Sequence, residues 1–238
     1  MRKNILRYSP LVLVLLAGCV GEPDVDSSLT EKVTSDGTRI LRSDTARLTA
    51  PSTDAPVTIA TDFLRTRGAV ASLKDINVVS ETTERGGVTH VRLSQTVNGL
   101  RVHGAYARVA ISEHGEVLQS IERLARATGR IAPVQVREQD ALSVTLKQLG
   151  YSETPAQARV QGNRTDFDLT SELYRAPSVE RVAYLGEDGA LHAGFLVETW
   201  SKRENQLDHT LVDGEGAIVS SELRTNNDSY KVFVEDPS

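Results

Sequence analysis

Apolar and polar residues alternate along the middle of the chain, as expected of β-strands with one buried face. Residues 88–97 alternate in this way and then break at Asn98-Gly99, a dipeptide that favours a tight hairpin turn. An extended, largely apolar segment resumes at 102–111, and a second polar turn leads into another strand at 117–121. The pattern predicts a three-stranded antiparallel sheet.

Two other segments follow the helical period instead. Residues 56–67 and 136–149 each place apolar side chains at three- and four-residue spacing. Each is followed by a glycine, Gly68 or Gly150, where a helix C-terminus is expected. An extended segment begins at 73–79 after the first of these helices. The first half of the chain is therefore predicted to be a helix laid on an antiparallel sheet.

The second half repeats this order. After its helix, a polar stretch at 152–177 predicts a loop with one short strand near 167–174. Four strand patterns then follow, at 181–185, 191–200, 207–212 and 217–223, with glycine-containing turns after the first and the third. The order of elements predicts the α+β class, with two units of similar construction.

The N-terminus resembles a bacterial lipobox. Basic residues precede an apolar run too short to span a bilayer, and Leu16-Ala17-Gly18-Cys19 follows at once. The resemblance implies a signal peptide at 1–18, cleavage between Gly18 and Cys19, and acyl chains on Cys19 that anchor the chain in a membrane. The expected location is the bacterial cell envelope, with Val20 favouring the outer membrane. An ordinary signal peptide and a secreted protein are the alternative.

Residues 19–55 are rich in Ser, Thr, Asp and Pro and offer few apolar anchors. Such a segment buries too little surface to offset the entropy lost on ordering. We expect a flexible tether, with a short strand at 38–48 as the alternative.

Composition narrows the class of partner. The chain has 238 residues, is 39% hydrophobic and 25% charged, and has a formal net charge of −5. This composition is that of an ordinary soluble protein, and the acidic balance argues against nucleic acid, which needs a basic face. Cys19 is the single cysteine, so the chain has neither an internal disulfide nor a cysteine metal site.

Catalytic motifs are missing from the sequence. There is no His-Glu-x-x-His helix, no G-x-S-x-G and no glycine-rich loop that opens a helix. The histidines are scattered over predicted strands and turns, so we expect neither a metal site nor a cofactor. They are His90, His103, His114, His192 and His209.

The segment VRLSQTVNGLRVHGA at 91–105 resembles the fungalysin/thermolysin propeptide (FTP) motif, in which an Arg-x-x-Gln strand turns at a polar-Gly pair into a strand with Val-x-Gly. Residues 133–225 are similar to PepSY modules, chiefly through LDHTLVDGEGAIV at 207–219. The tail at 226–238 resembles the junction to a fungalysin-type catalytic domain, which this chain lacks.

These resemblances imply an FTP-like module at 56–126 and a PepSY-like module at 133–225. We expect two small cystatin-like modules, each a helix on an antiparallel sheet, packed together behind the signal peptide and tether. The resemblance implies a non-catalytic, lipid-anchored prodomain-like protein that binds a fungalysin/thermolysin-type zinc metallopeptidase as inhibitor or folding assistant. A truncated remnant of a metallopeptidase precursor, an envelope adaptor that binds peptides or other proteins, and an unrecognised hydrolase are the alternatives.

The hairpin is the candidate docking element. Its Asn-Gly turn and the later glycine suit a strand that bends or lets another backbone approach closely. We expect it to dock on the peptidase through main-chain hydrogen bonds at a sheet edge. The candidate docking residues are Arg92, Gln95, Asn98, Gly99, Val102, His103, Gly104 and Tyr106.

Overall fold

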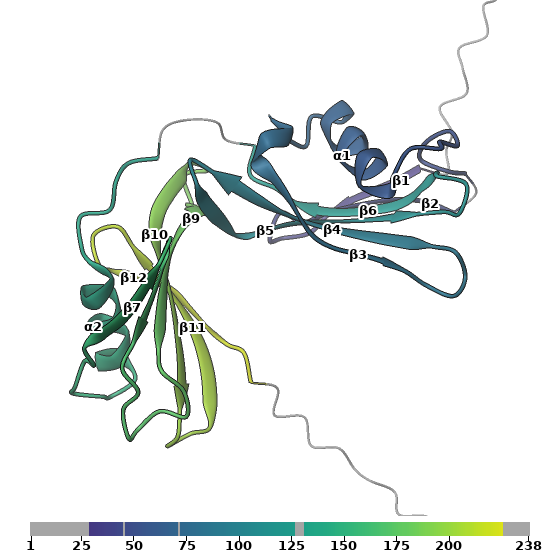
Figure 1. Cartoon of the computed structure of the whole chain (residues 1–238). Helices are drawn as coiled ribbons and strands as arrows, with labels where there is room; N and C mark the ends of the chain where they lie inside the picture. The colour runs from purple at the N-terminus through teal and green to yellow at the C-terminus, as the bar shows by residue number, and fades with distance from the viewer. Residues whose placement is uncertain (1–28, 45, 71, 127–130, 226–238) are drawn as a thin grey trace, which may run out of the picture.

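The computed structural model describes residues 29–44, 46–70, 72–126 and 131–225. Two units, each with one helix on an antiparallel sheet, lie at an angle to one another (Figure 1). The protein is therefore mixed α and β with mostly sheet, as the order of elements predicted. The predicted lipidation and cleavage site at Gly18 and Cys19, and the tail at 226–238, lie outside the described residues.

The first unit is a six-stranded sheet with the order β3-β4-β5-β6-β2-β1, antiparallel throughout. One face is covered by the helix α1. Its elements are β1 (Leu29–Val33), β2 (Arg39–Ser43), α1 (Pro56–Thr66), a 3₁₀ turn (Leu73–Asp75), β3 (Ile76–Thr83), β4 (Thr89–Val97), β5 (Leu100–Ile111) and β6 (Val117–Arg123).

The second unit has the strand order β7-β8-β9-β10-β11-β12, again antiparallel, with the helix α2 on one face. Its elements are α2 (Glu138–Gln148), β7 (Gln157–Gln161), β8 (Arg164–Phe167), β9 (Ser178–Leu185), β10 (Leu191–Ser201), β11 (Gln206–Asp213) and β12 (Ile218–Leu223).

Both helices end as the glycines predicted. Gly68 has φ +66° and Gly150 has φ +81°, the left-handed conformation that glycine adopts without steric cost. The Gly68 N–H donates to the Arg65 carbonyl at 2.9 Å, and the next N–H donates to an earlier carbonyl of the last turn. These bonds satisfy carbonyls that a helix end otherwise leaves open.

Each unit has its own apolar core between helix and sheet. Under α1, the side chains of Phe63 and Leu64 pack over Val91 and Leu93 of β4. Under α2, the corresponding cluster has fully buried members on four strands and the helix. Burial of a side chain of this size stabilises a fold by about 1.5–3 kcal/mol. The larger buried members of the second core are Leu142, Leu146, Phe167, Leu173, Val179, Phe195, Val197 and Val212.

Strand β5 belongs to both units. Its C-terminal half pairs with β4 and β6, whereas Arg101 and Val102 pair in parallel with Val182 and Ala183 of β9. Between these halves lies a bulge at 102–105, because a single residue of β4, Gln95, there stands opposite four residues of β5. We call the β5–β9 pairing the junction, and it joins the units into one continuous sheet of 12 strands.

Gly104 lies inside the bulge of β5 with φ +73°. In this conformation a residue with a Cβ is strained, so the glycine allows β5 to turn out of the first sheet and reach β9. The Val-x-Gly part of the hairpin motif is thus explained by backbone geometry.

The structure differs from the sequence-based expectation in two places. Residues 29–43, inside the expected flexible tether, form β1 and β2, and β2 pairs with β6. The backbone of these residues is thus hydrogen-bonded into the sheet, and the alternative of a strand within 38–48 is confirmed. The short strand expected near 167–174 is wrong in position, since the polar stretch instead forms a hairpin of β7 and β8.

Candidate interaction surface at the junction

Two of the eight candidate docking residues are buried inside the protein. The Gln95 side chain is 3% exposed and bridges both backbone groups of Ala125. Its Nε2 donates to the Ala125 carbonyl at 2.8 Å, and its Oε1 accepts from the Ala125 N–H at 2.8 Å. Gln95 therefore fixes the chain where it leaves β6, and this contact gives the Gln of the Arg-x-x-Gln motif a structural role.

Val102 is buried in a hydrophobic cluster that belongs to neither helix. The cluster joins Val97 and Val102 of the hairpin to Ala183 of β9, and Ala125 and Ile131 complete it. The hairpin thus docks on the second unit of the same chain. Docking of a partner strand on this edge, as the sequence suggested, is not available in this conformation, since β9 already pairs with Arg101 and Val102.

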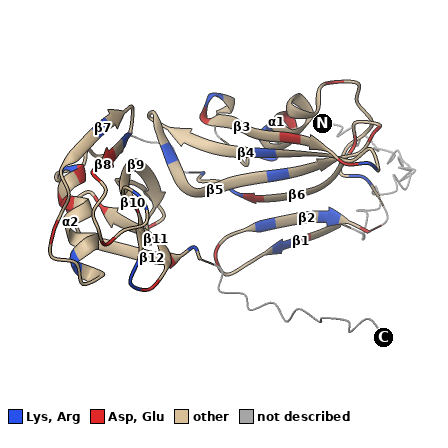
Figure 2. Cartoon of the chain, turned by 60° about the horizontal axis from the view of Figure 1, so that its bottom comes forward, with Lys and Arg blue, Asp and Glu red and all other residues tan. Residues whose placement is uncertain are grey.

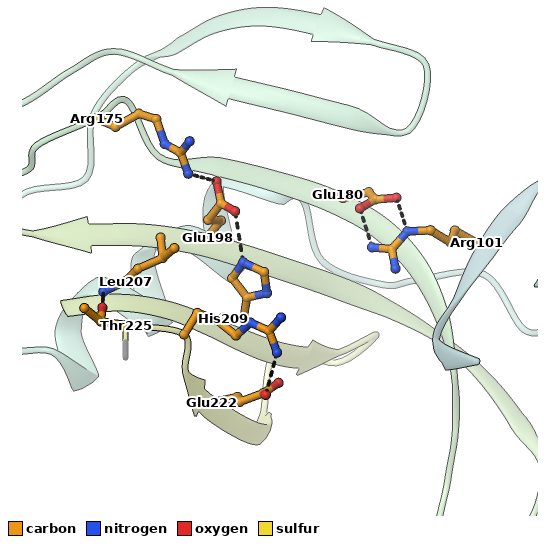
Figure 3. Close-up of polar contacts among 9 residues, drawn as sticks. Arg101, Arg175, Glu180, Glu198, Leu207, His209, Glu222 and Thr225 are labelled. Atoms are coloured by element: carbon orange, nitrogen blue, oxygen red, sulfur yellow. Dashed lines mark hydrogen bonds and ion pairs between the residues drawn. The ribbon is translucent and has the colours of Figure 1, made fainter. Parts of the chain in front are cut away.

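Polar contacts hold the junction at its surface. Arg101 Nε donates to Glu180 Oε1 at 2.9 Å, and Arg101 Nη2 donates to Oε2 at 2.6 Å, a two-point contact between β5 and β9 (Figure 3). Asn163, in the β7–β8 turn, donates its Nδ2 hydrogen to the carbonyl of Gly99 at 2.7 Å. Asn98 occupies the same hairpin turn with φ +52°. The carbonyl of Gly99 thus contributes to the contact between units.

Beside the hairpin, a cleft of about 360 Å³ opens between the two units. His103 and Gly104 of β5 line it from the first unit, and Tyr184 and Leu211 line it from the second. The complete lining is Asp36, Gly37, Val102, His103, Gly104, Ala105, Arg123, Leu124, Ala125, Tyr184, Leu185, Leu211, Val219 and Ser220. Two of the predicted docking residues, His103 and Gly104, therefore reach a surface where a partner could bind.

Burial sets the charge of the ring side chains in this cleft. It lowers the pKa of His103, and the nearby positive charge of Arg101 lowers it further, so His103 is neutral at pH 7. Burial also raises the pKa of Tyr184, and the carboxylates of Asp213 and Asp188 add to this effect. The cleft thus offers apolar walls with neutral hydrogen-bonding groups.

Two charged side chains, Asp36 and Arg123, also line the cleft. The pKa of Asp36 falls to about 2 because its carboxylate accepts hydrogen bonds from Thr34 and Thr38. Asp36 Oδ2 lies 3.8 Å from Nη1 of Arg123. A cleft that combines apolar side chains with a few polar groups is typical of a pocket that receives one side chain of a partner.

A row of polar side chains lies on the face of the second sheet that also lines the cleft. Glu198 of β10 accepts from Arg175 and contacts His209 Nε2 of β11 at 2.9 Å (Figure 3). Glu222 of β12 lies opposite His209 and accepts from Arg224 at 2.7 Å. This row is not predictable from the sequence, because its members are far apart along the chain and meet only through strand register. The one available signal in the sequence was the alternation of polar and apolar residues around His209.

The last two candidate residues lie elsewhere. Arg92 and Tyr106 project from the face of the first sheet opposite α1, because they alternate with the buried residues Val91 and Ala107. The eight residues are thus divided among the core of the first unit, the junction with its cleft, and this open face of the first sheet.

Within the described ranges no three His, Cys, Asp or Glu side chains gather closely enough to hold a metal ion. Among the same residues, no helix is both long and apolar enough to cross a membrane.

Comparison with known proteins supports the resemblance of the first unit. The model of the family described as the Fungalysin/Thermolysin Propeptide Motif matches residues 74–119, from the 3₁₀ turn into β6. The FTP resemblance is therefore confirmed for this segment, which contains the whole hairpin. The PepSY resemblance of the second unit stays a prediction.

A search of solved structures finds the Bacillus megaterium YpeB C-terminal domain, with a TM-score of 0.37 and 9% sequence identity over 83% of each chain. No curated protein gives a match to the chain.

Proposed function

We propose that this chain is a non-catalytic, prodomain-like protein that binds a fungalysin/thermolysin-type zinc metallopeptidase, as inhibitor or folding assistant. The observation on which the proposal rests is the FTP match at 74–119, which spans β3, β4, β5 and the start of β6. Propeptide motifs of this name precede such peptidases, so a protein that contains one is a candidate partner of that catalytic domain.

The proposed docking site is the cleft beside the hairpin. It takes the place of the free strand edge, because β9 occupies that edge at the junction. A loop of the peptidase inserts an apolar side chain between Val102 and Leu211 and hydrogen-bonds to the imidazole of His103 and the hydroxyl of Tyr184. Both units line the cleft, so binding would depend on the junction that holds them in place.

The proposal extends to the parts of the chain around this site. The second unit, at 133–225, acts as a PepSY-like module, and the two units are cystatin-like in construction.

Acyl chains on Cys19 hold the protein in the cell envelope, with Val20 favouring the outer membrane. Replacement of Cys19 by serine should abolish acyl labelling and release the protein from membranes, and continued labelling would refute the anchor.

An inhibition assay tests the function directly. Purified residues 20–238 should slow fungalysin- or thermolysin-like peptidases of the same organism, or raise the yield when such an enzyme is refolded. Val219→Asp should weaken this effect by about tenfold or more, since Val219 lines the cleft, is 48% exposed, and the new charge must lose its water on docking.

Val160→Asp is the matched control. Val160 lies on β7 and is 57% exposed, so the same change there should leave the effect intact. No complex and no inhibition at micromolar concentration with several such enzymes, and no gain in refolding, would contradict the proposal. Equal loss with both variants would move the docking site away from the cleft.

A further inference from the structure

The open face of the first sheet, on the side away from α1, presents three rows of side chains. Residues that stand directly opposite each other on neighbouring strands share a face, so the register defines each row. The first row crosses all six strands as Lys32, Ile40, Ile121, Arg108, Arg92 and Ser80. The second is Thr30, Arg42, Gln119, Ala110, His90 and Thr82, and the third is Arg123, Tyr106, Ser94 and Asn77.

Every ionisable side chain in these rows except Tyr106 is basic. The face presents Lys32, Arg42, Arg92, Arg108 and Arg123, together with His90, although the whole chain has a net charge of −5. Figure 2, in which the underside of the sheet is turned forward, shows the basic positions along β2, β4 and β5. The sheet thus separates its charges, with one basic face on an acidic protein.

Arg92 and Arg108 stand directly opposite each other on β4 and β5. Like charges at such a position destabilise a sheet, whereas an opposite-charge pair would stabilise it. Among the residues that the structure describes, neither guanidinium forms an ion pair, although the Arg108 guanidinium lies 5.8 Å from the centre of the Tyr106 ring. The two charges are therefore uncompensated within this part of the chain.

The two arginines line a hollow of about 510 Å³. Its other lining residues are of three kinds, one of which is the ion pair of Glu84 with His90 at 3.1 Å. Ser80, Thr82 and Gln119 supply hydrogen-bonding groups, and Ala110 and Ile121 supply a small apolar floor. A hollow with paired guanidinium groups suits carboxylates, which bind the planar arginine fork at two points.

We propose that this open face binds an extended acidic segment of a partner protein, with its carboxylates on Arg92 and Arg108. Two acidic side chains, one lining the hollow and one beside Arg42, favour a narrow ligand over a broad anionic surface. Glu84 lies 3.1 Å from His90, and Asp44 lies 3.9 Å from Arg42. A membrane or a nucleic acid would place phosphates against these carboxylates, whereas a peptide strand fits between them.

This inference stands without the proposed function. The open face and the cleft are lined by different residues, so a segment bound to the sheet need not come from a peptidase. If the partner is a peptidase, the open face adds a second, electrostatic contact to the docking in the cleft.

The test uses the full chain in a neutral detergent and a fluorescent peptide of alternating glutamate and serine. Six strands about 4.8 Å apart span about 24 Å, so a peptide of about eight residues covers the face. Fluorescence anisotropy should show binding that weakens as salt is added. Reversal of both arginines, Arg92→Glu with Arg108→Glu, should weaken binding by about tenfold or more.

The control reverses two exposed basic residues of the second unit, Lys147→Glu with Arg159→Glu, and should leave the affinity unchanged. Equal binding of a peptide with glutamine in place of glutamate would overturn the proposal, as would equal binding by the Arg92/Arg108 double variant. Preferential binding of a soluble short-chain phosphatidylglycerol, or of duplex DNA, would overturn it in favour of that ligand.

Thermal unfolding of the double variant shows whether it is folded, and the single variant Arg92→Glu gives a second measurement. That single variant creates an opposite-charge pair with Arg108, so it should be at least as stable as the original chain yet bind the peptide more weakly. Peptidase inhibition measured on the same samples separates the two proposals. If the double variant loses peptide binding but still inhibits the peptidase, the two arginines act only in peptide binding at the open face. If the original chain binds the peptide but inhibits no peptidase, only the proposed peptidase function is refuted.

Discussion

The amide of Gln95 gives partners to two backbone groups that would otherwise be buried without any. It bonds both the N–H and the carbonyl of Ala125, at the point where the chain leaves β6. A buried backbone group without a partner costs about 1–3 kcal/mol. Gln95→Leu removes both bonds while keeping the volume of the side chain, and should lower the free energy of unfolding by about 3 kcal/mol. Urea denaturation measures this change.

Gln161→Leu provides the comparison for that experiment. Gln161 lies exposed on β7, and its replacement should shift the unfolding free energy by less than about 0.5 kcal/mol. A similar small shift for Gln95→Leu would show that the Ala125 backbone finds other partners, and that the hairpin glutamine is free for a partner protein.

Glu122 is a buried acid on the α1 side of β6. It is 7% exposed and its Oε2 has no hydrogen-bond partner in the described chain. Burial raises its pKa above the ordinary 4.5, although Arg126 and Arg67 act in the opposite direction. The folded protein therefore holds this proton more tightly than the unfolded chain does. The stability contribution is greatest at low pH and is lost as the pH rises through the folded pKa.

Glu122→Gln should consequently stabilise the protein at pH 7, and its advantage should disappear below about pH 4. Thermal unfolding at a series of pH values measures this dependence. Glu187→Gln, at an exposed turn, should leave the unfolding temperature unchanged. A variant at position 122 that is destabilised at pH 7 would mean that contacts with the neighbouring arginines outweigh the cost of burial.

Among the elements, the turns show most directly how sequence sets structure. Gly99 and Gly115 occupy two hairpin turns with nearly the same φ, +78° and +74°. A Cβ at Gly99 would meet no atom within 4 Å, but a Cβ at Gly115 would lie 1.9 Å from the carbonyl oxygen of Ser52. Gly99→Ala should cost about 1 kcal/mol of backbone strain, and Gly115→Ala should cost at least about 2 kcal/mol more.

Urea denaturation of the two alanine variants gives the difference, with each acting as the control for the other. Equal costs would mean that the chain around Ser52 moves aside easily, so that its packing over the β5–β6 turn adds little stability.

The same scale shows which elements a sequence can predict. The helices α1 and α2 and the strands β4, β5 and β6 bury one side, so their apolar residues repeat at the period of the element. In β1 and β7 every residue is exposed, so neither strand has an apolar period. Edge strands of this kind are held by backbone hydrogen bonds, to which the side chains give no clue.

At the scale of the whole molecule, the decisive feature is the junction, which the sequence did not predict. The alternation of apolar and polar residues in the hairpin indicated that one face is buried. It does not show whether a partner protein or another part of the same chain buries that face. The structure shows that β9 provides this cover for Val102. Of the predicted docking residues, Gly99 and Val102 contact the second unit of the same chain, and docking on a peptidase stays a prediction. Arg92 and Tyr106 take no part in this contact, because they lie on the face of the first sheet opposite α1.

The relative position of the two units depends on few contacts, and Glu180 is central among them. Each unit has its own core, whereas the junction has two backbone pairs, a small apolar cluster, the Asn163–Gly99 hydrogen bond and the Arg101–Glu180 ion pair. Glu180→Ala should lower the unfolding free energy by only about 0.5–1 kcal/mol, since both side chains of the pair are partly exposed. It should nevertheless widen the range of inter-unit orientations, which small-angle X-ray scattering detects as a broader distance distribution.

Glu138→Ala is the matched control, because it removes an ion pair of α2 with Arg181 that lies wholly within the second unit. It should leave the scattering profile unchanged at a similar cost in stability. If the cleft is the peptidase site, Glu180→Ala should also weaken inhibition, since its two walls come from different units. An unchanged scattering profile for Glu180→Ala would show that the ion pair is not needed to hold the units. The apolar cluster around Val102 and Ala183 would then fix the position of the hairpin through hydrophobic burial.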